Sequence, residues 1–128
     1  MELQKVLFVG AGGFIGAVLR YLVSLAAAGL FGDRLPWGTL IVNALGGLFI
    51  GVLMELSIAT DLIPPAMRLF LVTGILGGLT TFSAFSWETV SLFCGGSTIK
   101  AVFNICLNLF LSLGGVLLGK LIASKLSF

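Results

Sequence analysis

Four long apolar stretches, separated by short connectors, are the feature that most limits what this chain can fold into. They cover about residues 7–31, 37–59, 69–93 and 101–123 and leave few other residues. A helix needs roughly 20 mostly apolar residues to cross a bilayer. With 59% hydrophobic and 9% charged residues, the chain cannot supply the polar surface of a water-soluble domain. We therefore expect one all-α membrane domain over residues 1–128, with four transmembrane helices and no extramembrane enzyme.

The positive charges are divided almost evenly between the two sides of the membrane. With four spans, one face carries Lys5, Arg68, Lys120 and Lys125, and the other half carries Arg20, Arg34 and Lys100. An excess of Lys and Arg normally marks the cytoplasmic side. A balance of four against three leaves two interpretations open, which are one weakly specified orientation and insertion both ways round. The net charge of +2 gives no reason to expect a nucleic-acid partner.

Glycines recur four residues apart on every span. The pairs are Gly12 and Gly16, Gly47 and Gly51, Gly74 and Gly78, and Gly115 and Gly119. This spacing lets two helix backbones approach closely, and close packing explains most of these glycines. A monomer of four helices could hardly enclose both a helix core and an aqueous path. We therefore expect a homo-oligomer.

The third stretch has a polar, glycine-rich centre. Residues 73–81 (TGILGGLTT) contain three glycines and three threonines at mid-membrane. Because glycine weakens a helix, the Gly77-Gly78 pair favours a broken helix over an intact glycine-rich packing face. A break in the membrane requires protein or a cavity to satisfy the freed backbone groups. The freed carbonyls could bind a small cation.

Polar residues also share helix faces on the second and fourth stretches. Thr39 and Asn43 lie four apart, and Asn104, Asn108 and Ser112 form a stripe with the spacing i, i+4, i+8. One interhelical hydrogen bond would explain a single buried Asn. Several amides and hydroxyls facing inward favour a wet path instead.

Aromatic and charged residues complete the candidate lining. Phe82 and Phe85, interleaved with Ser83, share one helix face directly after the predicted break. Arg20 lies in the middle third of its span, where a lone charge costs about 2.5–3.5 kcal/mol, so it must face a vestibule or a partner. The acids, Glu88 among them, lie toward span ends or in connectors, and histidine is absent. Such a lining offers donors to an anion and no relay for a proton.

Three segments resemble the Fluc (CrcB) family of bacterial fluoride channels. They are residues 12–21 (GGFIGAVLRY), 38–43 (GTLIVN) and 74–86 (GILGGLTTFSAFS). The resemblance implies an antiparallel, dual-topology homodimer in the bacterial inner membrane, which would account for the balanced charges. The implied function is passive export of fluoride from the cytoplasm, which limits its toxicity.

The resemblance also implies roles for particular residues. A structural sodium ion at the dimer centre would be bound by the backbone carbonyls of Gly77 and Thr80 from each subunit. Phe82 and Phe85 would line two fluoride pathways, and Asn43 would orient ring and ion. The remaining pathway candidates are Thr39, Ser83, Asn104, Asn108 and Ser112, and Arg20 and Glu88 would belong to the vestibules.

Two other functions suit a small four-helix membrane protein. A proton-coupled multidrug exporter can also have near-balanced charges, but its mechanism needs a membrane-embedded carboxylate, and the first span has Arg20 and no acid at mid-depth. A helical accessory subunit without transport of its own would need neither the polar stripe nor the predicted break.

Overall fold

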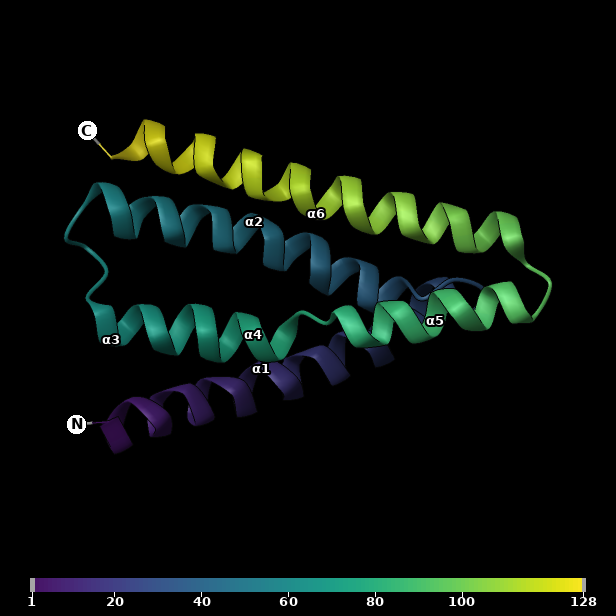
Figure 1. Cartoon of the computed structure of the whole chain (residues 1–128), viewed down its shortest axis with the longest axis horizontal. Coiled ribbons are helices and arrows are strands. Elements are labelled where there is room, and N and C mark those ends of the chain that lie inside the picture. The colour runs from purple at the N-terminus through teal and green to yellow at the C-terminus, as the bar shows by residue number, and fades with distance from the viewer. Residues whose placement is uncertain (1, 128) are drawn as a thin grey trace.

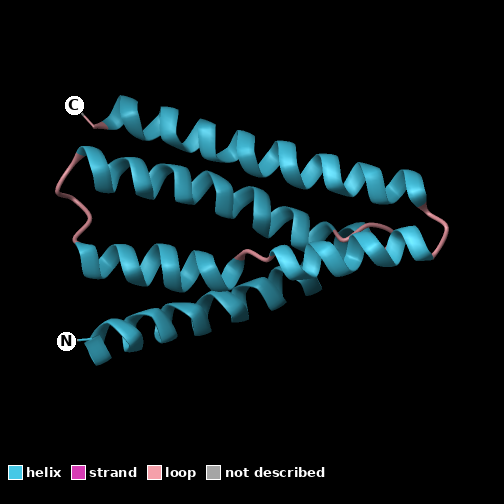
Figure 2. Cartoon of the chain, viewed as in Figure 1, coloured by secondary structure: helices cyan, strands magenta, loops and turns pink. Residues whose placement is uncertain are grey.

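The computed structural model describes residues 2–127 and contains four helical spans (Figures 1 and 2). The elements are α1 (Glu2–Phe31), α2 (Trp37–Ala59), α3 (Pro65–Arg68), η1 (Leu69–Leu76), α4 (Gly77–Leu79), α5 (Phe82–Cys94) and α6 (Thr98–Leu126). The third span consists of α3, η1, α4 and α5. All four spans are long and apolar enough to cross a membrane. The bounds of α2 coincide with the predicted stretch, and the other three spans extend beyond theirs.

The spans form a bundle in which successive helices run in opposite directions (Figure 1). Both termini and the connection between α2 and α3 lie at one end of the bundle. The connections between α1 and α2 and between α5 and α6 lie at the other end. In this arrangement α2 packs along α6, and α1 packs along η1. The distribution of charged residues between the two ends is the one expected from the sequence.

Glycines bring α1 against the third span at backbone distance. A Cβ atom placed on Gly12 would lie 2.5 Å from the carbonyl oxygen of Phe70. A Cβ atom on Gly78 would lie 2.5 Å from the carbonyl oxygen of Gly13. Neither position can hold a side chain unless a backbone moves. Both glycines therefore serve the close packing that holds membrane helices together.

The contact between α2 and α6 uses the same device. A Cβ atom on Gly47 would lie 2.5 Å from the carbonyl oxygen of Ser112, and one on Gly119 would collide with the carbonyl oxygen of Leu48. The predicted glycine pairs therefore do lie at helix contacts. The pair on α1 faces the pair on the third span, and the pair on α2 faces the pair on α6.

The third span is broken, as predicted, but the break lies beyond the glycine pair. Thr80 (φ −82°, ψ 154°) and Thr81 (φ −154°, ψ 121°) are extended. Gly77 remains helical at φ −64° and ψ −35°. Before it, η1 is a π-helix, a form often found as short segments near functional sites. The glycine pair therefore does not itself interrupt the helix, because Gly78 is used for packing on α1.

Candidate functional site

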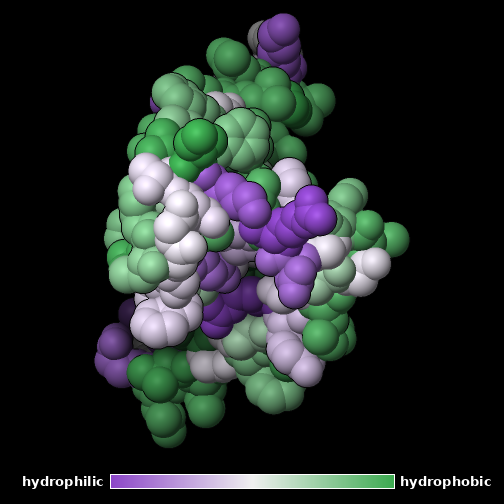
Figure 3. Space-filling model, turned by 90° about the vertical axis from the view of Figure 1, so that its right-hand side faces the viewer, coloured by the Kyte–Doolittle hydropathy of each residue, from purple (hydrophilic) through white to green (hydrophobic). Residues whose placement is uncertain are grey.

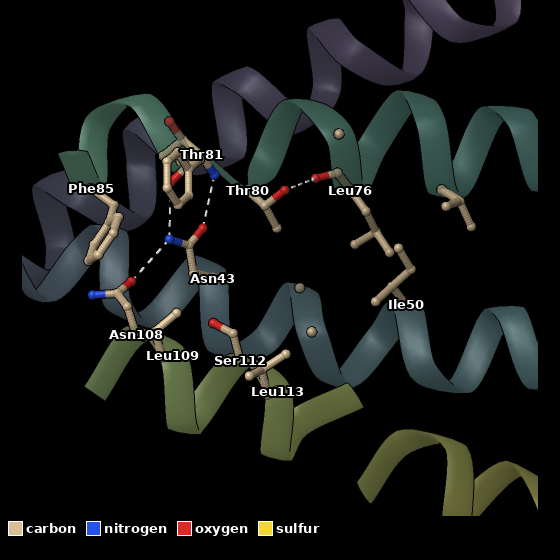
Figure 4. A pocket seen from close by; sticks show the side chains of 15 residues that line it. Asn43, Ile50, Leu76, Thr80, Thr81, Phe85, Asn108, Leu109, Ser112 and Leu113 are labelled. Carbon is tan, nitrogen blue, oxygen red and sulfur yellow. Dashed lines mark hydrogen bonds between the residues drawn. The ribbon is translucent and has the colours of Figure 1, made fainter. Parts of the chain in front are cut away.

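Asn43 of α2 holds the break in the third span. The backbone N–H of Thr81 donates to Asn43 Oδ1 at 2.9 Å, and Asn43 Nδ2 donates to the carbonyl oxygen of Thr81 at 3.1 Å (Figure 4). A primary amide offers the same donor and acceptor as a peptide group. The Asn43 side chain thus replaces the helical partners that Thr81 lacks, as a backbone group buried in a membrane requires.

The break leaves the backbone carbonyls of Gly77 and Thr80 without their helical donors. In an uninterrupted helix, Thr81 N–H would donate to the carbonyl of Gly77, and Ala84 N–H would donate to that of Thr80. The Thr81 N–H is taken by Asn43, and Ala84 N–H donates to Thr81 Oγ1 at 3.1 Å, which caps α5. Gly77 and Thr80 both line the groove described next, whereas Gly78 faces α1.

A groove of about 380 Å³ lies between α2, the third span and α6 (Figure 4). Its polar lining comes from Asn43, Thr80, Thr81, Asn108 and Ser112. The rest of its lining is glycine, aliphatic side chains and two phenylalanines. Candidate residues from three separate spans thus line the same groove.

The two phenylalanines form an aromatic pair at one end of the groove. The ring centroids of Phe82 and Phe85 are 5.5 Å apart and the rings are tilted by 54°. Phe85 is buried at 8% exposure, while Phe82 is 76% exposed in the single chain. Phe82 therefore lacks a covering partner within the described residues, and Phe85 forms part of the helix core.

The amides of α6 are joined to α2 and α5 by hydrogen bonds. Asn43 Nδ2 donates to Asn108 Oδ1 at 3.1 Å, and Asn108 Nδ2 donates to both the carbonyl and Oδ1 of Asn104 at 3.0 Å. Asn104 Nδ2 donates in turn to Thr89 Oγ1 at 3.0 Å. Asn104 does not line the groove. Its amide forms an interhelical hydrogen bond with Thr89, which is the simpler of the two explanations considered for the polar residues on this face of α6. Asn108 and Ser112 do line the groove.

Thr89 is a residue that the sequence reasoning missed. It is buried at 6% exposure, and its hydroxyl donates to the carbonyl oxygen of Phe85 at 2.7 Å while accepting from Asn104. One sequence signal could have found it, since Thr89 lies four residues after Phe85 on the same face of α5. Residues 80–91 contain six Ser and Thr residues, so this spacing does not by itself single out Thr89.

A second, smaller pocket lies at the end of the bundle that carries the α1–α2 connection. It measures about 250 Å³ and is lined by Asp33, Arg34, Pro36, Trp87, Glu88, Ser91 and Leu92. Figure 3 shows hydrophilic side chains gathered at this end between hydrophobic ones. Thr39 Oγ1 donates to Glu88 Oε1 at 2.8 Å. The other carboxylate oxygen, Glu88 Oε2, is buried and has no hydrogen-bond partner within residues 2–127.

The remaining candidates lie outside these clusters. Arg20 is half-buried on α1 and has no hydrogen bond or ion pair with any of the described residues. Ser83 is exposed, and its hydroxyl lies 3.2 Å from Thr81 Oγ1. Within residues 2–127, no three His, Cys, Asp or Glu side chains come together as metal ligands.

Comparison with known proteins agrees with this architecture. Residues 7–120 match the family described as CrcB-like protein, Camphor Resistance (CrcB). The chain belongs to the CrcB family. It is 52% identical over 122 residues to the fluoride-specific ion channel FluC of Clostridium perfringens, an alignment that covers 95% of each chain.

Two further relatives carry the same name. The fluoride-specific ion channel FluC of Clostridium novyi is 48% identical over 93% of each chain. That of Shewanella pealeana is 47% identical over 92% of this chain and 94% of its own. The match to CrcB extends over all four spans, and the chain is a multi-pass membrane protein as predicted.

Proposed function

We propose that this chain forms a fluoride-selective channel that lets fluoride leave the cytoplasm passively. The observation that carries the proposal is the groove at the helix break, which is lined by hydroxyl-bearing residues and by an aromatic pair near the middle of the third span. Its relatives across nearly the whole chain are named for fluoride conduction. The same comparisons favour a channel over a proton-coupled exporter.

Fluoride is small and strongly hydrated, so a selective path must replace its water with compact donors. The Ser112 and Ser83 hydroxyls and the positive ring edges of Phe82 and Phe85 are of this kind. Both hydrogens of the Asn43 amide already have acceptors, namely the Thr81 carbonyl and Asn108 Oδ1. We therefore assign Asn43 the role of holding the break and the neighbouring ring rather than of binding the ion directly.

The remaining candidates have distinct roles in this proposal. Thr39 and Glu88, which are hydrogen-bonded to each other, would form the wall of a vestibule with the Arg34 side chain nearby. Arg20, which has no hydrogen-bond or ion-pair partner among the residues that the structure describes, would raise the local concentration of anions. Asn108 would form part of the groove wall, and Asn104 would support it from behind.

We propose further that two copies associate as an antiparallel homodimer across the groove. The groove opens on the surface of the single chain, and Phe82 at its edge is largely uncovered. Within residues 2–127, close packing does not explain Gly77, because the nearest atom to an added Cβ would be the Val72 carbonyl oxygen at 3.7 Å. A glycine there is explained if a second copy approaches closely. Near-equal charge at the two ends would allow the copies to insert in opposite directions.

The groove residues fit a sodium ion at the centre of such a dimer. The Gly77 and Thr80 carbonyls lack their helical donors and belong to residues on the groove, and two copies would supply four oxygens. Neutral, hard carbonyl oxygens suit a monovalent alkali ion better than a transition metal. When bound, the ion would lower the electrostatic barrier to an anion at mid-membrane.

Efflux from liposomes tests the function directly. Vesicles containing only this protein and loaded with fluoride should release it far faster than protein-free vesicles, while chloride-loaded vesicles should retain their contents. Fluoride release at the protein-free rate, or equal release of chloride, would contradict the proposal. Drug uptake driven by a pH gradient without fluoride release would support the exporter instead.

A further inference from the structure

A chain of hydrogen bonds begins on the wall of the groove and continues behind it, and each Asn amide in it donates its N–H to the next residue of the chain. The chain, called here the amide ladder, consists of Thr81, Asn43, Asn108, Asn104 and Thr89. It joins the break in the third span to the middle of α5 by way of α2 and α6. None of its bonds is longer than 3.1 Å.

The direction of the ladder is set at both ends by backbone groups that cannot reverse. At one end, the Thr81 N–H can only donate, so Asn43 must present Oδ1 to it and Nδ2 to Asn108. At the other end, the Phe85 carbonyl can only accept, so the Thr89 hydroxyl donates to it and accepts from Asn104 Nδ2. The two ends demand the same orientation of the three amides between them.

The ladder also determines where the Thr80 carbonyl points. The peptide bond between Thr80 and Thr81 is trans and planar, so its C=O and N–H point in opposite directions. Because the Thr81 N–H is held on Asn43, the Thr80 carbonyl is directed away from Asn43. Thr80 and Asn43 both line the groove, and this carbonyl is one of the oxygens assigned above to the cation.

We propose that Thr89 is a positioning residue that acts through the amide ladder on the Thr80–Thr81 peptide. Thr89 does not line the groove and is buried, so it would touch neither ion. Its hydroxyl is the acceptor that keeps the Asn104 amide in the orientation the break requires. The consequence for conduction rests on the proposed function, whereas the coupling between Thr89 and Thr81 does not.

The test compares Thr89→Val, which keeps the shape and removes the hydroxyl, with Thr89→Ser, which keeps the hydroxyl. In Thr89→Val the buried Asn104 Nδ2 loses its acceptor, and the amides can reorient. We expect fluoride efflux to fall about tenfold and amide hydrogen exchange at Thr81 to accelerate by a similar factor. Thr89→Ser should restore both.

Thr60→Val is the matched control. The Thr60 hydroxyl also donates to the carbonyl four residues earlier, to Leu56 at 2.6 Å, but it lies outside the ladder. It should leave both readouts unchanged. If Thr89→Val does not fold, Asn104→Ala breaks the same link from α6 and should give the same pair of effects.

Three results would overturn the inference. They are unchanged exchange at Thr81 in the Thr89→Val variant, unchanged efflux in that variant when the unmodified protein does conduct fluoride, and an equal response from Thr60→Val. If the unmodified protein shows no fluoride efflux but Thr89→Val still accelerates exchange at Thr81, the proposed function fails and the coupling stands. In a double-mutant cycle, Thr89→Val should add nothing to Asn104→Ala, because Asn104→Ala already removes the bond between Asn104 and Thr89.

Discussion

At the scale of single residues, the side chains that replace backbone partners matter most. The Asn43 side chain pairs with both the backbone N–H and the backbone carbonyl of Thr81. The Thr81 side-chain oxygen in turn caps α5 by accepting from the N–H of Ala84. Each of these contacts satisfies a group that lipid could not. A membrane protein can therefore open a helix at mid-depth only where such side chains are available.

Phe82 offers the most direct test of the pathway at this scale. It is 76% exposed in the single chain, so Phe82→Ile should leave folding intact while removing the positive ring edge. We expect fluoride efflux from liposomes to fall at least about tenfold. Phe85→Ile should act in the same direction but with an additional cost in stability, because Phe85 is buried.

Phe110→Ile is the control for this substitution. Phe110 is 74% exposed on α6 and does not line the groove, so its loss should leave efflux unchanged. Normal conduction by well-folded Phe82→Ile and Phe85→Ile variants would show that the aromatic pair is not part of the pathway.

At the scale of helices, the glycine pairs decide which spans are neighbours. The pairs on α1 and the third span face each other, as do those on α2 and α6. Without a hydrophobic force between helices in lipid, contact between backbones becomes a main source of association. The break in the third span is then placed against α2, where Asn43 can reach it.

Two glycines on α1 allow this idea to be tested within one helix. A Cβ atom on Gly12 would meet the backbone of Phe70 and Gly74, whereas one on Gly10 would have no neighbour within 4 Å. Gly12→Ala should destabilise the protein by about 1–3 kcal/mol through overpacking. Gly10→Ala should be neutral or stabilising by up to about 1 kcal/mol. Thermal unfolding in detergent would measure both, and equal effects would contradict the packing assignment.

At the scale of the whole molecule, the proposed second copy would account for both the open groove and the balanced charges. Both termini lie at one end of the bundle, so the orientation of each copy can be read from the C-terminal end (Figure 1). Lys125 lies there and is exposed. Cys94 and Cys106, the two native cysteines, are both exposed and must first be replaced.

Labelling a single cysteine at position 125 should then reveal both orientations. If the copies insert both ways round, about half should react with an impermeant reagent from each side of the membrane, since no strong charge bias selects one orientation. Labelling of all copies from one side would exclude the antiparallel dimer.

Sodium should stabilise this dimer. Replacing sodium with a large organic cation is expected to shift the protein toward monomers in detergent, because four converging carbonyls would repel one another without an ion. Thr80→Ser should keep the sodium dependence, since the proposed ligand is a backbone oxygen. Gly77→Val should keep the monomer fold, because an added Cβ there meets only the Val72 carbonyl oxygen at 3.7 Å among the described residues. It should lose the dimer, because the larger side chain would block the close approach of a second copy. Sedimentation that is independent of sodium would contradict the site.

The amino-acid sequence by itself determined the spans, the glycine contacts and the existence of a break. These depend on local composition, since apolar length sets a membrane helix and small residues permit close packing. The family motifs at residues 12–21, 38–43 and 74–86 also lie in a linear order that needs no structure to read.

Only the tertiary structure decided where the break lies and how its polar groups are satisfied. The sequence pointed to Gly77-Gly78, yet the chain opens at Thr80 and Thr81 because Asn43, 38 residues earlier than Thr81, supplies the replacement bonds. The inclusion of Thr89 in the ladder likewise depends on how α5 packs against α6. The local sequence indicates which secondary structure each segment prefers. A hydrogen bond between residues far apart in the sequence forms only when the helices are packed.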